Sequence, residues 1–566
     1  MQIKLNLTVF KIFSYIQVPA NILLIFSGVY TLFVPTGATI DVFLEIIFIS
    51  GTILNSIYLF ISHFHLRYKH NKNAGKVNWF LSGHLLSWFF LVISNLINIF
   101  MNSLIMDTES VYLTVTLFLS TLMTFMTHGL MIGAIFLLIS FFRKGDKRTN
   151  DILSQMPIRD NSYFEARPNI WKVMKGIGFV LLAFIFIIGV YIPAVFIPGG
   201  ADVQAYIAGN LSILLLFLLV FATLAVLRLL PRSKKKSHVA LTSGFVLFSI
   251  ILCTVNSLPL VHTYNTVNNL DHQFINEFGD NWESQIPVDL QVKFRQSPIF
   301  IKDVFFTLKT PEVEQVLDID YTFHKGNWLK FDWYAPLGIS ETSDLLPVII
   351  ALHPGSWQFY DKGVTNMFQV SRYLANQGYV VVDVSYGLYP EYTVQDMILQ
   401  IGNLTKFLET NANQYHTNLS STFFLGRSAG AHLSLVSGLG YNNSYWNGNF
   451  SAVVECKGII QYYGPTDLSE DFFLPLIGVN ETFFSNYNPI DLVSSSSPPI
   501  ISFQGTSDTL VEPGEASSLH QKMLANDRIT ILGLMPYAGH AFDSFYGYFH
   551  NQVSIYFMER FLALTN

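Results

Sequence analysis

The chain has 566 residues, enough for several domains at about 150 residues each, but only 13% of them are charged, against about 25% in typical globular proteins. Apolar residues make up 51%, with 50 Phe and 27 Tyr, so the composition excludes a disordered or collagen-like chain and indicates that much of the chain lies in lipid. The net charge of −6 divides into +10 for residues 1–261 and −16 for the remainder, and with basic residues confined to short clusters in the first part we expect no nucleic-acid partner.

Residues 1–261 are predicted to form a membrane region. They contain seven apolar runs, each close to the about 20 residues that cross about 30 Å of hydrocarbon. The runs cover approximately residues 13–34, 42–64, 78–101, 112–142, 176–197, 207–230 and 239–261. The first run is too long, and too polar at Gln17 and Asn21, for a cleaved signal peptide, so we expect it to stay in the protein.

The distribution of basic residues predicts the orientation of this region. Lys and Arg gather before the first run and after the second, fourth and sixth, whereas the loops near 35–41, 102–111 and 198–206 contain none. Because cytoplasmic loops hold an excess of Lys and Arg, the N-terminus is predicted to be cytoplasmic. Seven is an odd number, so the chain after Val261 should emerge on the extracellular or luminal side.

Sequons for N-glycosylation support this orientation more weakly. In the second part they occur at Asn403, Asn418, Asn442, Asn449 and Asn480. Such sites imply exposed loops in a secretory compartment and a glycoprotein if the host glycosylates. A chain rich in Asn and Ser also produces sequons by chance, and those at Asn6 and Asn210 would stay unused in this topology.

Three ionisable residues, Glu45, His84 and His128, fall inside the apolar runs. An ionisable group in lipid is by default a functional hypothesis. The favoured alternative is a Glu near the outer interface, with no evident partner, and two neutral histidines that bond to neighbouring helices. The apolar runs themselves predict no activity.

The second part is predicted to be an α/β domain. Residues 262–286 are expected to form a polar stem, and residues 287–566 alternate between short apolar strands and helical patterns, which is typical of a mostly parallel sheet. The expected strands cover residues 346–352, 379–384, 422–425, 458–462, 499–504 and 529–534. The two cysteines, Cys253 and Cys456, lie in different parts, so neither a disulfide nor a cysteine-based metal site is expected, and no cofactor is predicted.

The expected strand 422–425 runs into Gly426-Arg427-Ser428-Ala429-Gly430 and then a helical pattern. This is a G-x-S-x-G motif in the strand-turn-helix setting that exposes a serine nucleophile. Alone the pentapeptide is a weak signal, because a chain rich in Gly and Ser contains such motifs by chance. The residues that follow it therefore decide its meaning.

A serine nucleophile needs a base to take its proton and a third group to orient that base, in the chain order Ser, Asp or Glu, His. Asp508 follows the expected strand 499–504, and His540 follows the expected strand 529–534 in the small-residue loop Ala538-Gly539. Each alone reads equally well as an ordinary loop residue. The order and the strand-end positions together predict a Ser428-His540-Asp508 triad.

Four segments of the second part resemble the esterase and lipase group of α/β-hydrolases, near its hormone-sensitive-lipase, feruloyl/acetyl-esterase-like and kynurenine formamidase branches. They are HPGSW at 353–357, which resembles the His-Gly-Gly-x-Trp oxyanion motif, GRSAGAH at 426–432, DVSYGLYPE at 383–391 and KFDWYAP at 330–336. The resemblance runs from about Leu317 to Phe561 and does not extend into residues 1–261.

The resemblance implies roles for individual residues. It implies Ser428 as nucleophile, Asp508 and His540 as its partners, and the backbone N–H groups of Gly355, Ser356 and Ala429 as the oxyanion hole. Two positions depart from the family pattern. Pro354 replaces a glycine and has no N–H, although the expected donors are the next two residues. Gly387 stands where the family often has Arg, so the branch stays undecided.

The sequence leaves the substrate and the reaction type open. An aromatic stretch before Asp508 can form a lid or acyl pocket, or it can be core; it contains Phe472, Phe473, Leu474, Leu476, Phe483 and Phe484. An acylated lipid or acylated surface glycan suits a domain beside a bilayer, and a soluble ester is also compatible. We expect a membrane-anchored serine esterase or lipase. The alternatives are an acyltransferase that uses the same triad, and an inactive hydrolase fold used for binding or adhesion.

Overall fold

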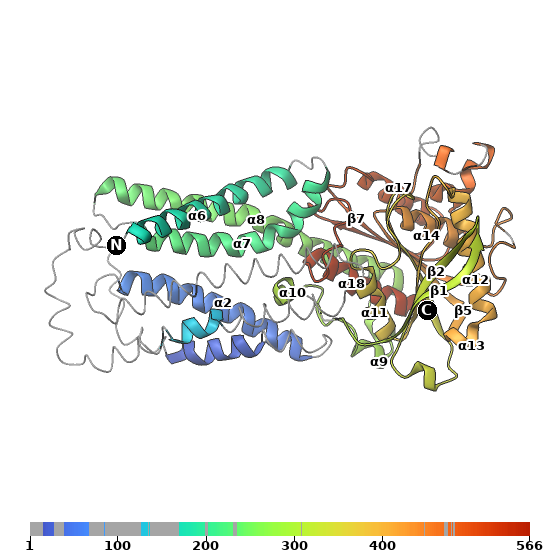
Figure 1. Ribbon diagram of the computed structural model, residues 1–566, viewed down its shortest axis with the longest axis horizontal. Coiled ribbons are helices and arrows are strands. Elements are labelled where there is room, and N and C mark those ends of the chain that lie inside the picture. The colour runs from blue at the N-terminus through green and yellow to red at the C-terminus, as the bar shows by residue number, and fades with distance from the viewer. Residues whose placement is uncertain are drawn as a thin grey trace.

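The computed structural model describes residues 15–27, 39–66, 84, 126–133, 135, 169–197, 202–229, 235–306, 308, 310–446, 448–468, 474–476, 478 and 481–566. Within these ranges the chain forms two parts that lie end to end along its long axis (Figure 1). Long helices make up the first part, and a sheet flanked by helices makes up the second.

The long helices of the first part coincide with four of the predicted apolar runs. They are α2 (Thr39–Leu66), α6 (Asn169–Phe196), α7 (Asp202–Leu229) and α8 (Lys236–Phe278). Among the described residues α8 alone is long and apolar enough to cross a bilayer, by length and composition, and shorter apolar helical stretches occupy Tyr15–Ser27, Leu44–Tyr58, Phe179–Val195 and Leu211–Leu227. Most of the predicted runs 78–101 and 112–142 lies outside the described residues, so the seven spans stay a prediction.

Residues 262–286, which the sequence predicts to be a polar stem, are largely helical. α8 continues to Phe278, and a short 3-10 helix, η2 (Trp282–Gln285), follows it. The stretch looks like a stem because the exposed face of the helix is polar. Its buried positions Thr263, Leu270 and Phe274 have helical spacing, and the last two belong to the core beside the sheet.

The second part contains one mixed sheet of eight strands in the order β1-β2-β4-β3-β5-β6-β7-β8. The strands are β1 (Glu314–His324), β2 (Asn327–Ala335), β3 (Leu346–Leu352), β4 (Val380–Val384), β5 (Thr417–Arg427), β6 (Cys456–Tyr462), β7 (Ile500–Gly505) and β8 (Thr530–Met535). β2 is antiparallel to β1 and β4, and the remaining pairs are parallel. This architecture fits the predicted α/β-hydrolase domain.

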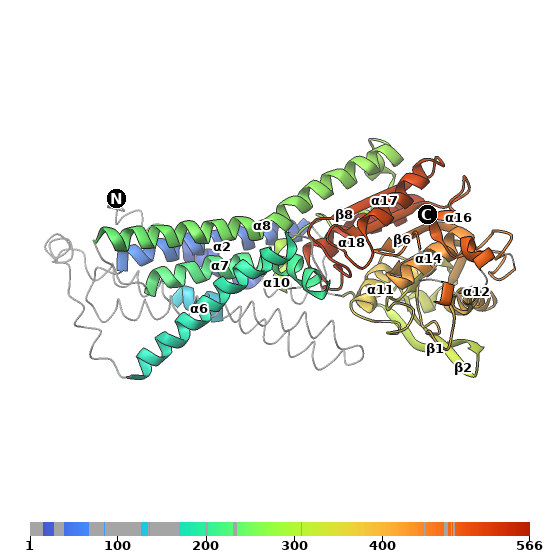
Figure 2. The same cartoon turned by 90° about the horizontal axis from the view of Figure 1, so that it is seen from above.

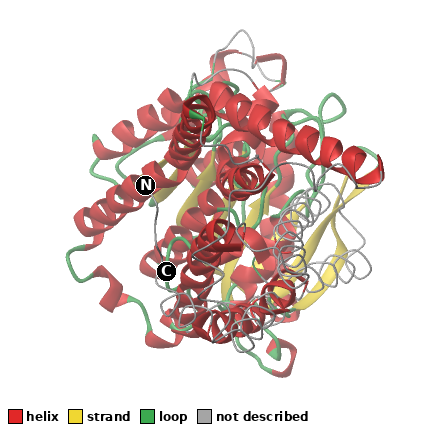
Figure 3. Cartoon of the chain, turned by 90° about the vertical axis from the view of Figure 1, so that its left-hand side faces the viewer, coloured by secondary structure: helices red, strands yellow, loops and turns green. Residues whose placement is uncertain are grey.

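Helices cover both faces of the sheet. The larger ones are α11 (Met367–Asn376), α12 (Val394–Thr410), α14 (Ala429–Gly440), α17 (Pro513–Leu524) and α18 (Phe549–Thr565), and the shorter ones are α9 (Val288–Gln291), α10 (Ile301–Phe306), η3 (Ile339–Glu341), α13 (Ala412–Tyr415), η4 (Glu481–Asn486) and α16 (Pro489–Leu492). α8, α11 and α18 share one hydrophobic cluster with the sheet, and α12, α14 and α17 share the other. Seen from the helical end, the strands are surrounded by helices (Figure 3).

α10 joins the second part to the first. The Glu45 carboxylate on α2 accepts hydrogen bonds from the backbone N–H groups of Ile301, at 2.6 Å, and Lys302, at 2.9 Å. The Phe305 ring packs edge-on against Phe217 of α7, with centroids 4.8 Å apart. The sequence offers no evident partner for Glu45, and the structure supplies one from the other part of the chain.

Candidate active site

Ser428 lies on a tight turn between β5 and α14. Its backbone has φ 51° and ψ −121°, a left-handed φ that is uncommon for a residue with a side chain. Side chains at Gly426 or Gly430 would overlap neighbouring backbone atoms, which is the steric reason for glycine in this motif. The Ser428 N–H donates to the Tyr462 carbonyl on β6 at 2.9 Å. The turn therefore fixes the Ser428 side chain at the carboxyl edge of the sheet.

The structure brings the three predicted triad residues together. His540 Nε2 lies 2.9 Å from Ser428 Oγ, and His540 Nδ1 lies 2.8 Å from Asp508 Oδ2. Ser428 is 7% exposed and Asp508 3%, so both lie largely out of water, while the His540 side chain keeps 19% exposure. The protonation that fits both contacts has the proton on Nδ1, which donates to Asp508 and leaves Nε2 to accept from the serine hydroxyl.

Asp508 is held in place by the turn that follows β7. Its Oδ1 accepts the backbone N–H groups of Leu510, at 2.9 Å, and Val511, at 3.0 Å. Its Oδ2 accepts from Gln504 Nε2 at 3.0 Å and faces the imidazole. The two oxygens thus have different tasks, because one anchors the carboxylate and the other orients His540.

The predicted oxyanion segment lies beside the serine turn. A side chain on Gly430 would overlap the carbonyl oxygen of His353, so the start of α14 touches the chain where it leaves β3. Gly355 and Ser356 follow this contact directly, and Ala429 is the first residue of α14. The three predicted donors therefore share the same edge of the sheet.

An unusual backbone shapes this segment. Gly355, Ser356 and Trp357 have φ of 132°, 54° and 60°. The His353 ring stacks on Tyr386 at 4.1 Å, and the Tyr386 hydroxyl donates to the His353 carbonyl at 2.6 Å. Burial lowers the pKa of His353 to about 4, so the ring is neutral at pH 7. These contacts hold the start of the loop against Tyr386.

Gly355→Val tests whether this loop supplies the oxyanion donors. A side chain at Gly355 would overlap the Phe359 carbonyl and would be strained at φ 132°, so the N–H groups should move. Loss of one oxyanion donor costs about 10²–10³ in turnover, and we expect a loss of that size with a short acyl ester. Ser356→Gly is the matched control, since glycine suits φ 54° and keeps the N–H. Full turnover in Gly355→Val would show that this loop does not supply the oxyanion donors.

A buried network that the sequence did not reveal supports the catalytic histidine. Arg427 Nε donates to Asp543 Oδ2, and the Tyr463 hydroxyl donates to Asp543 Oδ1, both at 2.5 Å. The Tyr463 ring then packs edge-on against His540, with centroids 4.7 Å apart. One residue of the sequence indicates such a network. Arg427 is a charged residue between an apolar strand and an apolar helix, and a buried charged residue needs a partner of opposite charge.

A second buried acid, Asp383 on β4, lies beside Asp332 on β2. Its Oδ2 accepts the Gly363 N–H at 3.0 Å, and its Oδ1 has no partner among the described residues. Lys362 pairs with Asp332 at 3.1 Å rather than with Asp383. Burial, followed by repulsion from Asp332, raises the pKa of Asp383 to about 7. The ionised form of Asp383 is therefore costly in the folded state.

Asp383→Asn should flatten the pH dependence of stability. Between the unfolded pKa of about 3.9 and the folded pKa of about 7, folded Asp383 holds a proton that the unfolded chain releases. This residue therefore lowers stability as the pH rises through that window. We expect wild type to lose more thermal stability from pH 5 to pH 8 than Asp383→Asn does. Exposed Asp344→Asn is the control, and equal losses in all three proteins would contradict the prediction.

The remaining ionisable predictions have ordinary partners. His84 Nδ1 lies 2.5 Å from the Thr127 carbonyl, and His128 Nδ1 lies 3.1 Å from Asn21 Oδ1. Both rings are buried and bonded to other helical segments, as the favoured alternative predicts. In the parts of the chain that the structure describes, no three His, Cys, Asp or Glu residues are grouped to hold a metal ion.

The aromatic stretch before Asp508 is partly core. Leu476 and Phe484 belong to the hydrophobic cluster that includes α14, whereas Phe483 is 45% exposed and packs against Tyr445. Phe472 and Phe473 lie outside the described residues. Core packing therefore accounts for part of this stretch, and a lid role stays a prediction.

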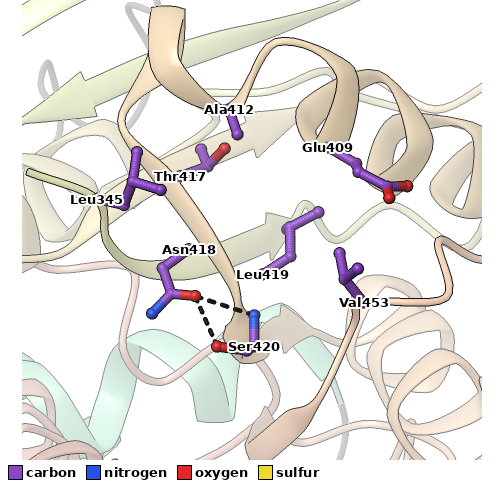
Figure 4. Close-up of a pocket in the computed structure, with 8 residues that line it drawn as sticks. All are labelled: Leu345, Glu409, Ala412, Thr417, Asn418, Leu419, Ser420 and Val453. Atoms are coloured by element: carbon purple, nitrogen blue, oxygen red, sulfur yellow. Dashed lines mark hydrogen bonds between the residues drawn. The ribbon is translucent and has the colours of Figure 1, made fainter. Parts of the chain in front are cut away.

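One surface pocket lies at the start of β5 (Figure 4). It is lined by Leu345, Glu409, Ala412, Thr417, Asn418, Leu419, Ser420 and Val453. Thr417 starts β5, whereas Ser428 follows its last residue, so the pocket is separate from the triad. Two residues of the sequon, Asn418 and Ser420, line the pocket, and Asn418 Oδ1 accepts a hydrogen bond from Ser420 Oγ at 2.7 Å.

Comparisons with known proteins agree with the motifs. The BD-FAE family model matches residues 331–523. Esterase LipC of Mycobacterium tuberculosis is 26% identical over 215 residues, which cover 35% of this chain and 53% of the relative. Kynurenine formamidase of Salmo salar is 29% identical over 165 residues, which cover 29% and 50%. The chain thus spans about half the length of these curated relatives.

Among solved structures, esterase B of Lactobacillus rhamnosis is 20% identical, with a TM-score of 0.39, over 45% of this chain and 88% of that one. The family match and the curated relatives support placing the second part of the chain in the esterase group of α/β-hydrolases. LipM of Mycobacterium tuberculosis, named as a probable carboxylic ester hydrolase, is 23% identical over 245 residues, which cover 40% of this chain and 56% of that relative. The family match does not reach residues 1–261, so it gives the predicted membrane region no support.

Proposed function

We propose that the protein is a membrane-anchored serine hydrolase that cleaves carboxylic esters through a Ser428-His540-Asp508 triad. The observation that carries the proposal is the continuous contact from Ser428 Oγ through the imidazole to the Asp508 carboxylate, at 2.9 and 2.8 Å. The esterase relatives support the reaction class.

The geometry suggests how each residue acts. His540 Nε2 takes the hydroxyl proton as Ser428 Oγ attacks the acyl carbon, and Asp508 stabilises the imidazolium. The N–H groups of Gly355, Ser356 and Ala429 donate to the oxyanion that forms. His540 then gives its proton to the leaving alcohol, and an acyl-enzyme stays on Ser428. A water molecule repeats the sequence and releases the acid.

Labelling with a fluorophosphonate tests this proposal on the full chain in detergent. We expect the probe to modify wild type and Ser420→Ala, whose serine lies at the other end of β5, but not Ser428→Ala. Hydrolysis of short acyl esters should follow the same pattern. Absent labelling of folded wild type would favour an inactive binding protein. If an added alcohol is acylated and no acid is released, the protein is an acyltransferase.

The proposed orientation places the second part on the extracellular or luminal side, with a cytoplasmic N-terminus. Glu45 and Gly209 lie shortly after the predicted loops 35–41 and 198–206, which lack Lys and Arg, and both contact the second part of the chain. This shared end of the helices is the one that the charge distribution assigns to the outside. A protease added outside intact cells should then cleave the second part, and protection of a tag after Asn566 would reject this orientation.

The proposed substrate is an acyl ester that reaches the site at the bilayer surface, such as an acylated lipid or an acylated surface glycan. The contact of the second part with the outer ends of α2 and α7 supports this position. Comparing hydrolysis of esters in vesicles with hydrolysis of soluble esters separates the classes.

A further inference from the structure

The loop that carries His540 lies between the sheet and the helices of the first part. It begins where β8 ends, at Met535, and its segment 537–539 passes close to two glycines from opposite directions. A side chain on Gly505, at the end of β7, would overlap the Ala538 carbonyl, and one on Gly209, on α7, would overlap the Tyr537 carbonyl. The loop backbone is thus enclosed on one side by the catalytic sheet and on the other by the helical part.

Tyr537 anchors this loop in the helices. Its ring packs against the hydrophobic cluster of α6, α7 and α8, which consists of Ile185, Ile192, Leu215, Leu219, Ala222 and Leu252. The His262 ring of α8 lies 5.4 Å from it. The backbone of Tyr537 has φ 58°, and its N–H donates to Thr506 Oγ1 at 2.9 Å. The packing therefore supports a left-handed conformation three residues before the catalytic histidine.

α8 also binds the strand that leads into the loop. β8 is the last strand of the sheet, so one of its edges has no partner strand. Gln273 side-chain atoms bond to both the N–H and the carbonyl of Leu532, at 2.8 and 3.0 Å, and Thr266 Oγ1 donates to the Leu534 carbonyl at 2.8 Å. Figure 2 shows α8 extending past the other long helices alongside β8. The edge strand is thus completed by side chains of the helix.

We propose that α7 and α8 position the catalytic histidine, with Gly209 and Tyr537 as the positioning residues. The inference rests on the proposed function, because it assigns a task to the helical part in that same reaction. A displacement of about 1 Å at a catalytic group costs about a hundredfold in rate. The contacts at Gly209 leave no room for a methyl group without moving Tyr537.

Gly209→Ala tests the proposal in the full chain, with Gly244→Ala as the matched control, because a side chain at Gly244 on α8 would meet nothing within 4 Å. The measurements are kcat and KM for a short soluble acyl ester, with kcat expressed per site titrated by a fluorophosphonate. We expect kcat to fall about ten- to a hundredfold with KM unchanged, and Gly244→Ala to match wild type. A merely structural defect would lower the number of titrated sites and leave kcat per site intact, which would overturn the proposal.

Thr266→Val keeps the proposal testable if Gly209→Ala does not fold. It removes the bond to β8 without adding a clash. Thr242→Val is its control, because among the described residues Thr242 Oγ1 bonds only to the His238 carbonyl of α8, at 2.9 Å. We expect kcat per site to fall in Thr266→Val alone, and equal kcat in the two variants would overturn the proposal. Failure of this positioning proposal can be told apart from failure of the proposed function. If the proposed function is wrong, turnover should survive in Ser428→Ala.

Discussion

Ser428→Ala should lower turnover of a short acyl ester by about 10⁴ to 10⁶ without unfolding the protein. The Ser428 hydroxyl lies 2.9 Å from His540 Nε2, and alanine removes it while keeping the backbone that the turn requires. The measurement is kcat in detergent, with thermal stability measured on the same sample.

The double variant Ser428→Ala/His540→Ala decides whether the two residues act as a unit. Either single change already removes the proton transfer, so the second should cost little more. Among the described residues, the Ser428 and His540 side chains form no hydrogen bonds beyond the triad contacts given above. If the loss of kcat in the double variant equalled the product of the two single losses, Ser428 and His540 would act in separate steps.

The strands that the sequence identified are those buried on both faces. Residues 346–352 and 499–504 read as continuous apolar runs, because parallel strands between two helical layers have no solvated face. The edge strand β1 was missed. It is mostly exposed, it carries Asp318 at φ 59°, and its pairing with β2 is irregular at two places, so it shows neither a clear alternation nor an apolar run.

The triad was accessible to sequence reasoning because its members follow strand ends in a fixed order. The contacts between the two parts of the chain could not be predicted from the sequence, because they join single residues that lie far apart in the chain. Glu45 reads as an isolated acid in an apolar run, and Gly209 as an ordinary small residue of a helix. Their partners, Ile301 and Tyr537, carry no motif, since the interacting groups are backbone atoms.

Asp508→Asn should lower kcat by about 10⁴ while the fold is retained. The reason lies in the different tasks of the two carboxylate oxygens. Oδ1 accepts the N–H groups of Leu510 and Val511, so the amide oxygen of asparagine should take that place. Its NH₂ group then faces His540 Nδ1, where Oδ2 now lies at 2.8 Å.

An NH₂ group in that position can only donate, so the imidazole must accept at Nδ1 and carry its proton on Nε2. This tautomer cannot take the proton of Ser428. Asp467→Asn is the matched control, because Asp467 is an exposed acid that contacts Asn488 and Glu515 rather than the imidazole. We expect its kcat to equal that of wild type. If Asp467→Asn lost activity and Asp508→Asn kept it, the orienting acid would be Asp467, and the contact between Asp508 and His540 would have no part in the chemistry.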